Sequence, residues 1–218
     1  MPRVLLTGFE PFGGGKQNVS AEVVTRFAHK VVPGLEVHTQ IFPVDIAIAP
    51  QYLIDRLISL VPDWCIMLGE ASGRTAITLE RVAINLCDFR IADNGGHQPR
   101  DEQVIPDAQD AYFTTLPVRD LLNSIQATGV QSELSLSAGS YLCNAVFYTA
   151  LHYSSVYNLP TRCGFIHLPN LETLALVESY TGIYAALETL ALEKTAKPVA
   201  TPRHSGTNKP TQQAPAYW

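Results

Sequence analysis

Hydrophobic side chains recur along this chain with two different periods. Short apolar runs at residues 4–6, 64–68 and 164–168 are typical of buried strands. Residues 35–42 alternate apolar with polar side chains, as a half-exposed strand does. Residues 75–86 alternate for most of their length and predict one further strand. Predicted strands are therefore spread along the chain instead of being gathered in one part.

Segments with apolar residues at helical spacing lie between these strands. The first is capped by Asn18 or Ser20, runs to about residue 30 and ends at Pro33 and Gly34. Three more such segments cover residues 46–60, 118–128 and 174–193. Up to residue 68 the order is strand, helix, strand, helix, strand, which favours an α/β layered domain.

The stretch at residues 134–153 joins a strand pattern, a turn and a helix. Its first residues alternate in hydrophobicity, residues 137–140 are small, and residues 142–150 carry apolar side chains at helical spacing. Cys143 therefore falls in the first turn of the predicted helix.

This position suits a cysteine nucleophile. Unpaired backbone N–H groups and the positive end of the helix dipole favour a thiolate, and the same N–H groups can hold an oxyanion. A strand, a tight turn, a nucleophile and a helix follow one another in nucleophile elbows, although the G-x-S-x-G pattern is absent here. The alternative is that Cys143 is a small buried hydrophobe at a helix start. The residue alone leaves both interpretations open.

Two further residues are candidates by position only. Glu80 lies within an alternating segment beside Arg81, where an acidic residue is usually solvated or salt-bridged at the surface. His167 lies at the end of a strand just before a loop, which suits a site and is also common at a surface. Residues 7–15 are glycine-rich but lack the dinucleotide and P-loop spacings, so they do not favour a phosphate-binding loop. Phe9 and Phe12 in this loop favour an apolar wall instead.

Composition limits the class of protein. The 218 residues are 46% hydrophobic, enough for a substantial core, and we expect a single domain over residues 1–193. Residues 194–218 lack acidic residues and apolar periodicity and contain several prolines, which predicts a disordered tail. The net charge of −5 gives no reason to expect nucleic acid or an anionic membrane as a partner. Without a leader pattern or a long apolar run, a cytoplasmic location is expected.

The cysteines show no pattern typical of a metal or a disulfide framework. No C-x-x-C pair and no Cys/His cluster at metal spacing is present, so no metal or cofactor is predicted. Cys65, Cys87 and Cys163 lie in or beside apolar segments and are expected to be free thiols with packing roles.

Four motifs together resemble a known family. The segments GFEPFGG, GRTAITLERVAIN, SLSAGSYLCN and GFIHLP, spread in this order over residues 8–169, closely resemble the pyroglutamyl peptidase I family, also called pyrrolidone-carboxylate peptidases. The resemblance implies a three-layer α/β/α sandwich around a twisted, mostly parallel sheet. It also implies a catalytic triad of Cys143 as nucleophile, His167 as base and Glu80 as acid.

The resemblance extends to the substrate pocket. It implies an oxyanion role for Arg90 and a pocket for the pyroglutamyl ring that includes Phe9, Phe12, Asn18, Glu70, Ile91, Tyr141 and Leu142. Glu70 stands where many relatives have glutamine or an apolar residue, residues 106–112 lack a Gly-Pro-Ala run common in the family, and the basic tail is not a family feature.

The implied activity is removal of N-terminal pyroglutamate (5-oxoproline) from peptides and proteins through a thioester. No cofactor is implied, and because family members are often tetramers, a homo-oligomer is an open prediction. The alternatives are another small-amide thiol hydrolase on the same fold and a binding module that keeps the pocket without turnover.

Overall fold

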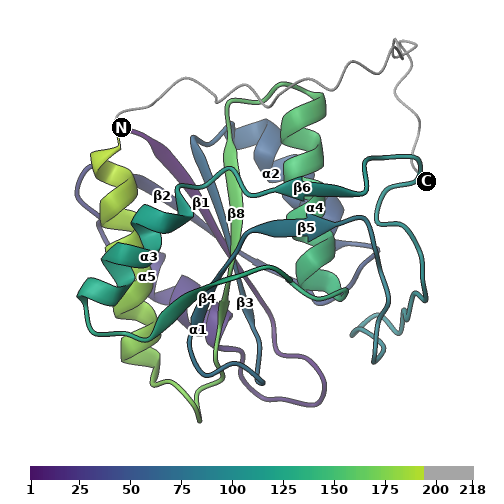
Figure 1. The fold of residues 1–218 in the computed structure, drawn as a ribbon, viewed down its shortest axis with the longest axis horizontal. Helices are drawn as coiled ribbons and strands as arrows, with labels where there is room; N and C mark the ends of the chain where they lie inside the picture. The colour runs from purple at the N-terminus through teal and green to yellow at the C-terminus, as the bar shows by residue number, and fades with distance from the viewer. Residues whose placement is uncertain (194–218) are drawn as a thin grey trace.

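Residues 1–193 are the part of the chain that the computed structural model describes (Figure 1). The predicted tail at residues 194–218 lies outside the described residues, so its disorder stays a prediction. Within residues 1–193, none of the helices is both long and apolar enough to cross a membrane.

A six-stranded sheet with the order β2-β1-β3-β8-β4-β7 runs through the middle of the molecule (Figure 1). Neighbouring strands are parallel except β4 and β8, which pair antiparallel. The sequence-based prediction of a mostly parallel sheet is therefore confirmed. The strands are β1 (Arg3–Phe9), β2 (Glu36–Phe42), β3 (Trp64–Glu70), β4 (Ile77–Glu80), β7 (Ser132–Ser135) and β8 (Arg162–Leu168).

Helices cover both faces of this sheet and complete three layers. Figure 1 shows α3 and α5 on one side of the sheet and α2 and α4 on the other, and α1 packs with α5. The fold is thus the expected α/β/α sandwich. The helices are α1 (Val19–Phe27), α2 (Ala49–Leu60), α3 (Val118–Ala127), α4 (Leu142–Val156) and α5 (Leu176–Leu192).

The alternation of side chains along each strand divides the core between the two faces. Val4 and Leu6 of β1 belong to the cluster under α1, α3 and α5, whereas Leu5 between them belongs to the cluster under α2 and α4. Ile66 and Met67 of β3 divide in the same way. Both faces of a strand are therefore buried, which explains why the apolar runs are continuous instead of alternating.

The predicted single strand at residues 75–86 is wrong in one respect. The segment forms β4, which ends at Glu80, and β5 (Val82–Ile84), which pairs antiparallel with β6 (Ala111–Phe113) in a second sheet. Arg81 lies at the break, because its N–H donates to Ser135 on one side (2.9 Å) and its carbonyl accepts from Thr114 on the other (3.0 Å). The short strand β6 was not predicted at all.

Two helix ends also differ from the expected positions. α1 ends at Phe27, before the predicted residue 30. α2 begins at Ala49 instead of residue 46, since the Asp45 carboxylate accepts the Ala47 N–H (2.8 Å) and so holds that segment in a turn.

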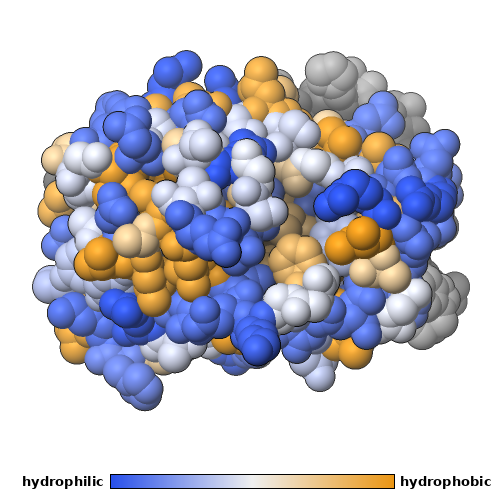
Figure 2. All heavy atoms as spheres, turned by 90° about the horizontal axis from the view of Figure 1, so that it is seen from below, coloured by the Kyte–Doolittle hydropathy of each residue, from blue (hydrophilic) through white to orange (hydrophobic). Residues whose placement is uncertain are grey.

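The carboxyl ends of β1, β3 and β8 lie together at one edge of the sheet, because these three strands are adjacent and parallel. This edge is at the bottom of Figure 1, and Figure 2 views it from below as a mixture of hydrophilic and hydrophobic side chains. Clefts at this edge of an open parallel sheet are the usual place for ligands.

Candidate active site

Cys143 is the second residue of α4, as the small-residue turn before it predicted. Tyr141, the residue just before the helix, has extended backbone angles, and no side chain of residues 1–193 caps the helix. The N–H groups of the first turn therefore remain available beside the sulfur.

The start of α4 is held by a buried asparagine that sequence analysis did not single out. Asn144 is fully buried, and its amide accepts the Ile84 N–H (3.0 Å) and donates to the carbonyls of Ile84 (2.8 Å) and Leu86 (3.0 Å). The only sequence signal was its position directly after Cys143. These bonds tie the turn that carries Cys143 to β5.

A glycine lets the sulfur approach the sheet. A Cβ atom built on Gly69 would lie 2.9 Å from Cys143 Sγ and 2.7 Å from the ring of Phe165, closer than real Cβ contacts. In the register of β3 and β8, Gly69 is paired with His167. The Cys143 sulfur therefore lies against the backbone of Gly69, the residue that is paired with His167.

His167 and Glu80 form a buried pair. His167 Nδ1 and Glu80 Oε1 are 2.8 Å apart, and the two side chains are 5% and 0% exposed. The antiparallel pairing of β4 with β8 aligns Thr78 with His167 and so brings Glu80 within reach. A surface position for Glu80 is therefore excluded. Because Nδ1 is engaged by the carboxylate, Nε2 is the nitrogen left for other chemistry.

The electrostatic environment of Cys143 keeps the isolated thiol protonated. Burial, and then the negative charge of Glu80, raises the pKa of the Cys143 thiol to about 12, and only its own backbone N–H acts in the opposite direction. A free thiolate is thus disfavoured near neutral pH. Ionisation of this sulfur requires an internal proton acceptor, and His167 lines the same pocket.

Arg74 also contacts Glu80, and sequence analysis missed it. Its Nη2 donates to Glu80 Oε1 (3.0 Å) and to the carbonyl of Ser137 (2.9 Å). A usable signal was present, because a buried carboxylate requires a nearby cation and two arginines lie within six residues of Glu80.

One pocket brings together most of the residues that sequence analysis proposed. The rings of Phe12 and Tyr141 both line it and form a tilted pair, with their centroids 6.1 Å apart. Val44 and Ala138 also line it and were not predicted. The lining residues are Phe9, Phe12, Asn18, Val44, Glu70, Ala138, Tyr141, Leu142, Cys143 and His167.

Asn18 and Glu70 both hold the start of α1 against the pocket. The Asn18 side chain accepts the Ser20 N–H (3.0 Å) and donates to the Glu10 carbonyl (3.1 Å). Glu70 Oε2 accepts the Val19 N–H (3.0 Å) at the positive end of the helix. One carboxylate oxygen of Glu70 is therefore committed to the protein itself.

Arg90 and Ile91 lie outside the pocket lining. Arg90 is exposed, its carbonyl accepts from Gln98 (3.1 Å), and its guanidinium makes no hydrogen bond or ion pair within residues 1–193. Ile91 Cδ1 lies 3.7 Å from where a Cβ on Gly13 would be. The structure thus places Ile91 against the loop that carries Phe12, and it does not bring Arg90 to Cys143.

We call the loop segments 10–18, 43–48 and 88–98 the rim of the pocket. Asn94 joins all three, because its amide donates to Glu10 Oε1 and to the Pro11 carbonyl (both 2.9 Å) while its N–H donates to the Val44 carbonyl (2.8 Å). The Tyr141 hydroxyl donates to the carbonyl of Ala92 (3.3 Å). The rim is therefore held mainly by side chains bonded to backbone groups.

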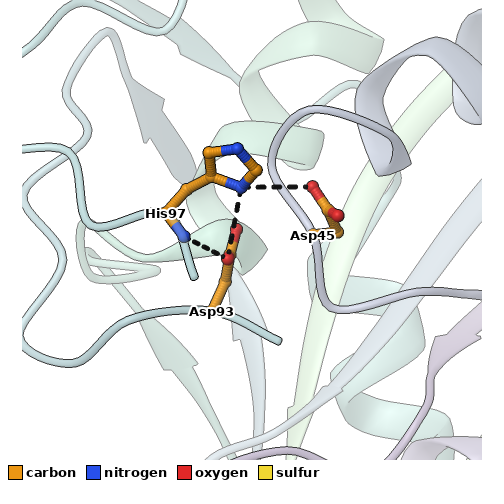
Figure 3. Close-up of side chains that lie close together, drawn as sticks. All are labelled: Asp45, Asp93 and His97. Atoms are coloured by element: carbon orange, nitrogen blue, oxygen red, sulfur yellow. Dashed lines mark hydrogen bonds and ion pairs between the residues drawn. The ribbon is translucent and has the colours of Figure 1, made fainter. Parts of the chain in front are cut away.

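Asp45, Asp93 and His97 form a clamp between two of the loop segments of the rim (Figure 3). His97 Nδ1 lies 3.5 Å from Asp45 and 3.4 Å from Asp93, and the His97 N–H donates to Asp93 Oδ1 (2.8 Å). These residues offer ligand atoms within 4.8 Å of one another, as a metal site would. The carboxylates, however, already accept backbone N–H groups, including that of Ile46 (2.8 Å), which accounts for the group as a loop clamp.

Comparison with known proteins agrees with this geometry. The family model described as pyroglutamyl peptidase matches residues 2–201. A pyrrolidone-carboxylate peptidase of Vibrio vulnificus (strain CMCP6) is 44% identical over 190 residues, 87% of this chain and 88% of the relative. One of Thermococcus litoralis is 41% identical over 78% of this chain and 77% of the relative.

Solved structures show the same similarity in three dimensions. The crystal structure of Bacillus amyloliquefaciens pyroglutamyl peptidase I superposes with a TM-score of 0.84 at 33% identity and covers 88% of this chain and 98% of that chain. The matched family model spans the strands and helices that form the pocket. This chain therefore belongs to the pyroglutamyl peptidase family.

Proposed function

We propose that this protein is a cysteine exopeptidase that removes N-terminal pyroglutamate from peptides and proteins. The observation that carries the proposal is one pocket in which Cys143 and His167 lie together, with the carboxylate of Glu80 on the far nitrogen of the histidine. Membership of the family supports the same activity.

The pocket suits a neutral lactam ring. Phe9, Phe12 and Leu142 provide apolar walls, and 5-oxoproline carries no charge that would have to be solvated. Glu70 Oε1 has no hydrogen bond within residues 1–193 and can accept the ring N–H. A free ammonium terminus would lose several kcal/mol of hydration among these apolar walls unless paired.

The chemical step follows from the arrangement of the three side chains. His167 Nε2 takes the proton of Cys143, and Glu80 holds the ring tautomer and stabilises the imidazolium. The thiolate attacks the carbonyl that joins oxoproline to the next residue. His167 then gives the proton to the leaving amine, and water releases oxoproline from the thioester.

The oxyanion is held by the Cys143 N–H at the start of α4. Loss of one such donor typically raises the barrier by about 3 kcal/mol. The oxyanion role predicted for Arg90 requires its exposed guanidinium to turn inward from the rim.

The test of the nucleophile is Cys143→Ala assayed with pyroglutamyl-β-naphthylamide. We expect the rate to fall by about 10⁴-fold or more, since sulfur forms the covalent intermediate. Cys87→Ala is the control, because this buried thiol is not part of the pocket. Turnover retained without the Cys143 sulfur would refute the assignment.

A panel of aminoacyl naphthylamides tests the substrate class. Preference for the pyroglutamyl compound over prolyl and alanyl compounds is expected, because these carry an ammonium. The opposite preference would favour another small-amide thiol hydrolase, and no turnover of any compound would favour a binding module.

A cytoplasmic location and a homo-oligomeric state complete the proposal. Fractionation of cells and size-exclusion chromatography with light scattering test them directly.

A further inference from the structure

A single oxygen of the buried Glu80 carboxylate makes all of its hydrogen bonds within residues 1–193. Glu80 Oε1 meets both His167 Nδ1 (2.8 Å) and Arg74 Nη2 (3.0 Å), while Oε2 has no partner within residues 1–193. Burial of a carboxylate is costly unless a cation and hydrogen bonds compensate. Arg74 is the permanent cation that forms an ion pair with this carboxylate.

The same guanidinium nitrogen reaches the turn that precedes the nucleophile. Arg74 Nη2 donates to the Ser137 carbonyl (2.9 Å), and the next residue, Ala138, lines the pocket. The backbone N–H of Arg74 donates to the carbonyl of Ala71, just after β3 (2.9 Å). Through its side chain and its backbone together, Arg74 thus connects the ends of β3 and β4 with the turn leading into α4.

The charges of Glu80 and Cys143 explain how a cation beside Glu80 favours ionisation of Cys143. The negative charge of Glu80 opposes ionisation of Cys143, because two anions in one buried site repel each other. When the proton passes from Cys143 to His167, the site holds a thiolate, an imidazolium, the Glu80 carboxylate and the Arg74 guanidinium. These four charges sum to zero.

We propose that Arg74 is a positioning residue for the reaction, which fixes the Glu80 carboxylate against His167, orients the turn before Cys143 and offsets the charge of Glu80. The inference builds on the proposed function, since it assigns Arg74 a role in the same triad. Arg74 acts through Glu80 and Ser137 and does not itself meet the reacting atoms.

Arg81 provides a matched control. It is the direct neighbour of Glu80, yet its side chain forms no ion pair within residues 1–193. Arg81→Ala therefore removes the same charge from the same segment without releasing the acid.

The first measurement is the rate of Cys143 alkylation by iodoacetamide as a function of pH, with Cys143→Ser correcting for other thiols. It reports thiolate formation and needs no turnover, so it is independent of whether the pyroglutamyl substrate is right. For Arg74→Ala we expect the rise of the alkylation rate to shift to higher pH by about half a unit or more, because one favourable charge is lost. Arg81→Ala should leave the profile of the unmodified protein unchanged.

The second measurement is turnover of pyroglutamyl-β-naphthylamide. Arg74→Ala should lower kcat by about 10-fold to 100-fold with KM changed less than about threefold, because the pocket lining is intact. Addition of guanidinium ion should restore part of the lost kcat in Arg74→Ala and none in Glu80→Ala.

Equal alkylation profiles for Arg74→Ala and Arg81→Ala would overturn the proposal. If Arg74→Ala does not fold, Arg74→Gln takes its place, since the amide can still donate to one carbonyl or carboxylate but carries no charge. An alkylation profile for Arg74→Gln identical to that of the unmodified protein would equally overturn it.

Discussion

The two sides of the pocket are built in different ways. The proposed catalytic side, meaning Gly69, Glu80, Cys143 and His167, is positioned by strand register and by the start of α4. The rim is held by side-chain hydrogen bonds between loops and by the clamp of Asp45, Asp93 and His97 (Figure 3). Groups that exchange protons need fixed distances, whereas a wall around a substrate tolerates movement. The comparison predicts that changes on the catalytic side affect kcat and that changes in the rim affect KM.

The largest effect that distinguishes the two sides is expected from Glu80→Gln. The amide keeps the shape of the side chain but cannot stabilise an imidazolium by charge, so kcat should fall by about 100-fold with little change in KM. Steady-state kinetics and thermal unfolding of the variant check this. Glu133→Gln on the neighbouring strand β7, where the side chain is exposed, is the control. Unchanged kcat in Glu80→Gln would mean that the buried pair has only a structural role.

Gly69→Ala tests how closely the sulfur must approach the sheet. The added methyl group would meet Cys143 Sγ and the Phe165 ring, so we expect a loss of about 1–3 kcal/mol in the free energy of unfolding. Displacement of the sulfur should also lower kcat by about 10-fold. Denaturant unfolding and kinetics measure the two effects. Gly73→Ala is the matched control, because its methyl group would lie in open space. Similar behaviour of the two variants would contradict the close approach.

The smallest effect is expected from His97→Ala in the rim. The imidazole is 48% exposed and its two carboxylate contacts are long, so its loss should cost less than about 1 kcal/mol. We expect KM for pyroglutamyl-β-naphthylamide to rise about threefold with kcat unchanged. His29→Ala is the control, because this histidine is also exposed but lies outside the rim. A fall in kcat without a change in KM would show that the two sides are not separate.

The strands of the central sheet were largely predictable because their signals are local. The apolar runs that became β1, β3 and β8 stand out in the sequence, and Asn18 caps α1 as expected. The division of residues 75–86 into β4 and β5 was missed, since it depends on bonds from Arg81 to Ser135 and Thr114, which are distant in sequence.

The residues of the candidate site were recognised from motifs, but their burial and their ion pairs were not. Nothing in the local pattern around Glu80 indicates full burial, and the surface interpretation was the natural one. Arg74 was overlooked although it lies only six residues from Glu80, because an ion pair is required there only once Glu80 is known to be buried. Arg90, in contrast, was assigned beside the nucleophile by resemblance, and the structure places it on the exposed rim.

The sequence by itself determined the order of the helices and of the central-sheet strands, the position of Cys143 in the first turn of a helix and the family to which the chain belongs. Only the tertiary structure decided that Glu80 is buried between His167 and Arg74, and that Gly69 leaves room for the sulfur. The reason is that periodicity reports the neighbours of a residue along its own element, whereas burial and charge pairing depend on strands and turns that meet only after folding.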